Sequence, residues 1–206
     1  MAHPLVLTVV TGWILASGVA CQWPGHRTID AGFWFERMTY SSPRLQGSLT
    51  AQDMKTIESV ARSELAHAFD GLRIVFSDRR DARYRVQVVQ TLRDFRFQRD
   101  VWVAGESRAV RGFGGHGAVS FFFLASGAIA SAPEDAGRDS IVEAIGRGVG
   151  RSAVHEFVHQ LLPTAPIHDS SDVQSYEYDS AARREQYFGG MRWNLAWPLL
   201  HEQFGR

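Results

Sequence analysis

Two histidines and one glutamate near the end of the chain have the types and spacing of a metal-dependent hydrolytic site. His155, Glu156 and His159 form a His-Glu-x-x-His pattern inside an apolar run of helical period. Residues four positions apart share one face of a helix, so both imidazoles can bind one zinc ion while the carboxylate lies beside it as a base. The alternative is a buried helix whose histidines only find hydrogen-bond partners, but burying these polar groups without a metal would be costly.

A catalytic zinc ion needs a third protein ligand and one open position for water. Glu177 is the ligand that we favour, because an antiparallel helix after a return loop would bring it level with His159. The sequence here resembles the gluzincin class of zinc metallopeptidases. Their third ligand is a glutamate on the second helix, followed three residues on by Ser or Ala, as Ser180 follows here.

The second candidate for the third ligand is His168, which is followed by Asp169. This pair is similar to the third histidine and the aspartate of the metzincins, a resemblance that would make Met191 the methionine beneath the zinc ion. Residues 175–178 are also similar to a segment of the aspzincins, which would leave Asp169 as a third option for the ligand.

The candidate that does not bind the metal could still have a role. With Glu177 as the ligand, His168, Tyr176 or Tyr178 could donate a hydrogen bond to the oxyanion of the reaction. With His168 as the ligand, Glu177 could orient a zinc-bound histidine.

The order of apolar patterns predicts an α+β domain with one mixed sheet, and the resemblance to the zinc metallopeptidases implies that its architecture is zincin-like. We expect a mixed β-sheet that packs against the long His-Glu-x-x-His helix and a backing helix, with a return helix after them. The expected strands are 28–36, 72–76, 84–91 and 118–124, with an irregular or hairpin segment at 92–111. The expected helices are 50–69, opened by a capping box at Thr50, then 139–162, 172–188 and an amphipathic piece within 191–204.

The Gly-rich residues 112–117 lead into the expected strand 118–124, and residues 126–137 are predicted to be a loop. A phosphate-binding loop should leave a strand and open a helix, so this order argues against a nucleotide site. The strand could border a cleft, where an extended peptide adds to a free strand edge, or be an ordinary core strand.

Residues 1–21 are predicted to be a signal peptide, with an apolar stretch at 4–20 that ends at the only cysteine, Cys21. Ala-Ser-Gly-Val-Ala-Cys resembles a bacterial lipoprotein processing site, which implies a lipid anchor on Cys21. We therefore expect an exported protein of the cell envelope or periplasm, lipid-anchored or secreted. Residues 27–206 should form one domain.

The 22 basic and 22 acidic residues balance, so no broad positive field indicates nucleic acid. The motif predicts a zinc metallopeptidase that acts on a peptide or protein substrate, with Glu156 as the general base. The alternative is a non-catalytic envelope protein of zincin fold that binds a partner or a cell-wall component.

Overall fold

The main sheet has five strands and is mixed. The computed structural model describes residues 28–94, 101–110, 113–165 and 167–206. Strands β4, β1, β5 and β9 are parallel neighbours in that order, and β8 pairs antiparallel with β9 at the edge. Their bounds are β1 Ile29–Phe35, β4 Ile74–Ser77, β5 Tyr84–Val89, β8 Gly105–Val110 and β9 Gly114–Ser120. The α+β class expected from the sequence is thus confirmed.

Short elements connect these strands. They comprise the paired strands β2 (Ser41–Ser42) and β3 (Gly47–Ser48), the 3₁₀ turn Pro43–Leu45 between them, and the hairpin strands β6 (Arg93–Asp94) and β7 (Val101–Trp102). The hairpin lies within the segment for which a hairpin or irregular structure was expected.

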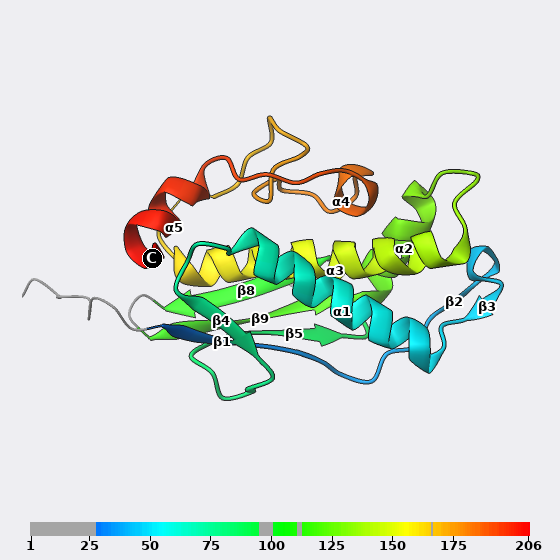
Figure 1. Cartoon of the computed structure of the whole chain (residues 1–206), viewed down its shortest axis with the longest axis horizontal. Helices are drawn as coiled ribbons and strands as arrows, with labels where there is room; N and C mark the ends of the chain where they lie inside the picture. The colour runs from blue at the N-terminus through cyan, green and yellow to red at the C-terminus, as the bar shows by residue number, and fades with distance from the viewer. Residues whose placement is uncertain (1–27, 95–100, 111–112, 166) are drawn as a thin grey trace, which may run out of the picture.

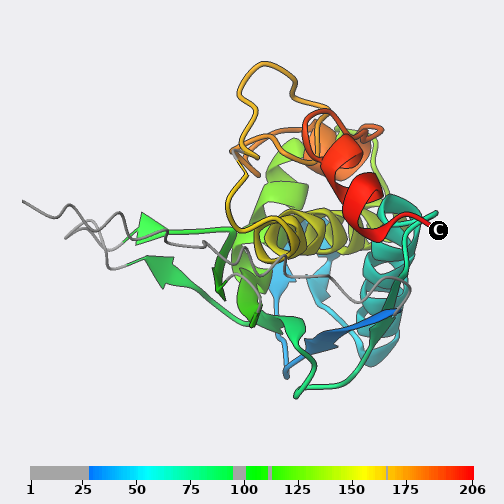
Figure 2. The ribbon, with the colours of Figure 1, turned by 90° about the vertical axis from the view of Figure 1, so that its left-hand side faces the viewer.

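Two long helices, α1 (Ala51–Ala68) and α3 (Arg138–Leu161), cover one face of the sheet, as Figures 1 and 2 show. In β5, Tyr84, Val86 and Val88 are buried and alternate with half-buried residues, because successive side chains of a strand point to opposite faces. The predicted capping box opens α1: the Thr50 hydroxyl accepts a hydrogen bond from the Asp53 N–H, and the Asp53 carboxylate accepts one from the Thr50 N–H.

Helix α3 runs without interruption through Gly146, Gly148 and Gly150, although glycine has a poor helix propensity. A Cβ atom at Gly146 would lie 2.7 Å from the Val60 Cβ, and one at Gly150 would lie 2.7 Å from the Ala61 carbonyl oxygen. The glycines therefore let α1 approach the α3 backbone closely, and this packing outweighs their poor helix propensity.

We expect the substitution Gly150→Ala to destabilise the protein by about 1–3 kcal/mol, although alanine favours a helix over glycine by about 1 kcal/mol. The added methyl group would overlap α1, so the two helices would have to separate. Urea denaturation measures the change in the free energy of unfolding. Gly190→Ala is the control, because nothing lies within 4 Å of its added Cβ. A Gly150→Ala protein as stable as the parent would contradict this account of the helix contact.

The prediction of a return helix at residues 172–188 is wrong. Only α4 (Glu185–Phe188) is helical there, and α5 (Ala196–Phe204) follows later. Side chains in this segment bind main-chain N–H groups locally: Asp172 accepts from Gln174, and Ser180 accepts from Ala182. Such turns compete with helix formation, and they hold residues 167–184 as an extended loop over α3 (Figure 1).

Two further predictions, a strand at 118–124 and a loop at 126–137, are wrong in part. Strand β9 already includes residues 114–117 of the Gly-rich stretch and ends at Ser120, whose hydroxyl then caps helix α2 (Phe121–Ser131). Gly115 of this strand leaves room for a side chain of α3, because a Cβ there would lie 2.5 Å from the Gln160 Cγ. The Gln160 amide, in turn, exchanges two hydrogen bonds of 3.0 Å with the main chain of Arg85.

The predicted signal peptide and Cys21 lie outside the described residues, so export and lipidation stay predictions. Within the described ranges, none of the helices combines the length and the apolar character needed to cross a membrane.

Candidate metal centre

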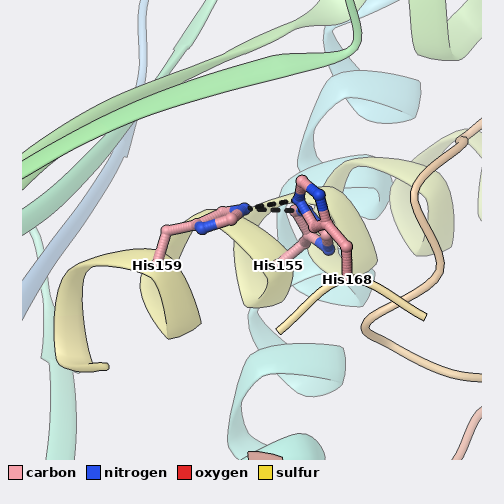
Figure 3. A group of neighbouring side chains, drawn as sticks. All are labelled: His155, His159 and His168. Carbon is pink, nitrogen blue, oxygen red and sulfur yellow. Dashed lines mark hydrogen bonds between the residues drawn. The ribbon is translucent and has the colours of Figure 1, made fainter. Parts of the chain in front are cut away.

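Three histidine side chains converge on one point beside helix α3. His155 and His159 come from successive turns of the helix, as predicted, and His168 comes from the loop after it (Figure 3). The Nε2 atom of His159 lies 3.1 Å from that of His155 and 3.0 Å from that of His168. Nitrogen ligands 2.0–2.1 Å from a tetrahedral zinc ion are about 3.3–3.4 Å apart. The three ligand atoms all lie within 4.8 Å of one another, so one ion can contact all three after the side chains adjust.

Hydrogen bonds alone do not account for this cluster. His155 Nδ1 lies 2.9 Å from the Tyr176 carbonyl oxygen, which can only accept, so the proton of a neutral His155 is on Nδ1 and its Nε2 is a bare lone pair. The Nε2 atom of His159 can donate to one of its two neighbours but not to both. A cation at the centre would satisfy all three nitrogens at once.

The surroundings keep the two helical histidines neutral, the form that binds metals. Burial lowers the pKa of His155 to about 4. Burial, together with the charges of His155 and His168, lowers the pKa of His159 to about 3. The Tyr176 carbonyl also fixes the ring of His155 with Nε2 directed to the cluster, the usual second contact of a metal-bound histidine.

His168 is exposed, and its two neighbours hold it in place. The side chain of Ile167 is 3 % exposed and packs in the core. The Asp169 carboxylate accepts hydrogen bonds from the N–H and hydroxyl of Ser171 and from the Asn194 amide. Asp169 thus orders the loop, and it is not a member of the histidine cluster.

Glu177, the third ligand that we favoured, is also outside the cluster. Its buried carboxylate accepts hydrogen bonds from the Ser175 hydroxyl and from the N–H groups of Asn194 and Ala196, the latter at 2.6 Å. Ala196 is the first residue of α5, so the carboxylate neutralises the positive end of that helix. The preference for Glu177 is therefore corrected: the structure brings His168 to the pair, and Glu177 fixes the loop that carries His168.

Glu156 lines a cavity of about 420 Å³ that the three histidines also line. Its side chain is 6 % exposed, and burial raises its pKa to about 8, with the charge of Glu106 acting in the same direction. The carboxylate rests on Gly105 at the start of β8, where a Cβ atom would lie 2.4 Å from Glu156 Oε1. Gly105 therefore leaves the space that this carboxylate occupies.

The cavity lies between the edge strand and the loop after α3. Residues 103–107 form one side, and Tyr176, Tyr178 and Arg183 belong to the other. The strand bordering the cavity is thus β8, whereas β9, which the sequence suggested, is enclosed between β5 and β8.

The candidate oxyanion donors Tyr176 and Tyr178 both reach this cavity. The Tyr176 ring is buried beside Trp193, and burial raises its pKa to about 12, so its phenol stays protonated. Met191 does not line the cavity but packs half-buried against the hydrophobic core, which does not match a methionine beneath the metal.

Three elements of the site were missed from the sequence: Glu106, Arg183 and the carbonyl oxygen of Tyr176. Glu106 lies in the segment 92–111, which has no clear period, and Arg183 was assigned to a helix that does not form. A main-chain carbonyl gives no residue-type signal at all.

Comparison of the chain with models of protein families, with curated proteins and with solved structures gave no match.

Proposed function

We propose that this protein is a zinc metallopeptidase of the zincin type. The observation that carries the proposal is the convergence of three histidine Nε2 atoms beside a buried glutamate, in a cavity that the edge strand β8 borders. Further support comes from the arrangement of the elements: a mixed sheet with an antiparallel edge strand, the motif helix α3 and the backing helix α1.

His155, His159 and His168 would hold the zinc ion beside the cavity. The ion supplies Lewis acidity toward the scissile carbonyl and toward an attacking water. Glu156 would accept a proton from that water and deliver it to the leaving amine. Burial raises the pKa of Glu156 and so favours its protonated form. A neighbouring dication would lower that pKa and favour the carboxylate, which is the form that a base requires. Tyr178, which also lines the cavity, would donate to the developing oxyanion.

A peptide substrate suits the edge strand. Within the described residues β8 is the last strand of the sheet, and its residues 105–107 line the cavity beside Glu156. An extended peptide can add to such an edge through main-chain hydrogen bonds, which places a peptide bond next to the histidines.

Metal analysis and a cleavage screen on the purified protein test this function together. Elemental mass spectrometry is expected to find about one zinc ion per chain. A mixed peptide library should be cleaved, the cleavage should stop after chelation, and it should resume when zinc is added back. A folded protein that takes up no zinc after reconstitution would contradict the metal site. Zinc without cleavage of any library peptide would favour a binding protein instead.

A further inference from the structure

The cavity continues past the histidines toward α4, where it is lined by an arginine whose charge is not neutralised. Arg183 is half-buried, and no carboxylate pairs with it in the part of the chain that the structure describes. Its guanidinium donates to the carbonyl oxygens of Ser180 and Ser175, and its Nε atom is buried without a hydrogen-bond partner. Two of its five N–H groups are used in this way, so donors remain for a ligand.

The second arginine of the cavity differs in this respect. Arg151 forms an ion pair with Glu64 at 3.0 Å and donates to the carbonyl oxygens of Glu185 and Gln186. It therefore belongs to the structure of the α4 region. Arg183 instead lies over the Tyr178 ring, with its guanidinium carbon 4.6 Å from the ring centre, a contact that helps to hold the side chain in place without neutralising its charge.

The direction of β8 decides which part of a peptide would reach Arg183. Strand β8 and helix α3 run the same way: Gly105 at the start of β8 lies against Glu156, and Ala109 pairs with Gly115, which lies against Gln160. A peptide added antiparallel to β8, the more stable pairing, then has its carboxyl-terminal part at the Gly105 end.

The Arg183 region lies beyond that same end. Gln186 of α4 donates to the Gly148 carbonyl and the Ser152 hydroxyl, and both of these α3 residues precede His155. Figure 1 shows α4 above the half of α3 that is nearer to α2. The residue that follows the scissile bond would therefore extend from the histidines toward Arg183.

Resting on the proposed function, we infer that Arg183 binds a carboxylate on the residue that follows the scissile bond. That carboxylate is either the side chain of Asp or Glu or the free carboxyl terminus of the substrate. Planar guanidinium groups bind carboxylates through two parallel hydrogen bonds, and a partly buried pair is stronger than an exposed one.

Two carboxylates that also line the cavity, those of Glu106 and Asp179, are compatible with this direction of the bound peptide. Glu106 follows Gly105 along β8, on the side that the amino-terminal part of an antiparallel peptide would occupy. Asp179 also lines the cavity, but it is exposed to solvent, where its repulsion of a ligand is screened.

Matched peptides test the inference. The first pair is acetyl-Ala-Ala-Glu-Ala-amide and its Gln counterpart, which differ in a side-chain carboxylate. The second pair is acetyl-Ala-Ala-Ala as the free acid and as the amide, which differ in the terminal carboxylate. Affinity is measured by calorimetry on the zinc-loaded Glu156→Gln protein, which should bind without turnover, and kcat/KM is measured on the protein with Glu156 intact.

In at least one pair the carboxylate form should bind about 10- to 100-fold more tightly, the range of a hydrogen bond between charged groups. Arg183→Gln should remove this preference, and Arg183→Lys should restore part of it. Arg184→Gln, which removes the same charge from an exposed neighbour, should leave the preference unchanged.

Equal affinity for both members of each pair would overturn the role of Arg183, as would a preference that survives in Arg183→Gln. These results are independent of turnover. Cleavage without any preference for carboxylates would leave the peptidase proposal standing, whereas carboxylate-dependent binding without cleavage would count against the peptidase alone.

Discussion

Replacing His168 with Ala is expected to remove stoichiometric zinc, whereas replacing Glu177 with Gln is expected to leave the zinc in place. The His168 Nε2 atom lies 3.0 Å from that of His159, so it is one of three ligand atoms in the cluster. Loss of a group that merely orients a zinc ligand costs about 10–100-fold in affinity, and loss of a ligand itself should exceed about 100-fold. Metal-competition titration with a chelator of known affinity measures both variants.

The Glu177→Gln protein should show its defect in stability. In the parent, the buried Glu177 carboxylate accepts hydrogen bonds from two main-chain N–H groups and one hydroxyl. The amide of glutamine has only one oxygen with which to accept them. Poorly satisfied buried partners cost about 1–3 kcal/mol each. Urea denaturation of the zinc-loaded protein measures this loss.

His116→Ala is the matched control, because this histidine is exposed and belongs to β9 rather than to the cluster. Full zinc affinity in His168→Ala would show that this loop histidine is not a ligand. Loss of zinc in a folded Glu177→Gln protein would restore Glu177 as the candidate.

The second large effect is expected for Glu156→Gln, which should lower kcat by about 10²- to 10⁴-fold, the usual contribution of a general base. The amide matches the carboxylate in shape, so it fits the same space against Gly105 but cannot accept a proton from water. Zinc content should stay near that of the parent, because Glu156 is not part of the histidine cluster.

Steady-state kinetics on a peptide from the library screen, with zinc measured on the same samples, test this role. Glu202→Gln, an exposed change of the same type on α5, should retain parental turnover. A Glu156→Gln protein that turns over within about tenfold of the parent would exclude Glu156 as the base.

The elements that could be predicted are those whose pattern is local. Helix 139–162 was expected and is Arg138–Leu161, and the capping box at Thr50 opens α1 as expected. Helical period, strand alternation and capping depend on neighbours within a few residues, so the sequence displays them directly. The prediction for residues 118–131 was wrong because Ser120 caps a helix where a strand was expected to continue. The prediction for residues 172–188 was wrong because side chains such as Asp172 and Ser180 accept hydrogen bonds from nearby main-chain N–H groups, and these turns replace a helix.

By itself, the sequence determined that His155 and His159 share one helical face with Glu156 beside them, because the four-residue spacing fixes that geometry wherever the helix packs. Only the tertiary structure decided the third member of the cluster. The route of the loop after α3 depends on bonds from Glu177 to Asn194 and Ala196, 17 and 19 residues further on, and on the burial of Ile167. Contacts over such distances leave no periodic trace in the chain, so His168 and Arg183 become recognisable as site residues only once the loop is folded over α3.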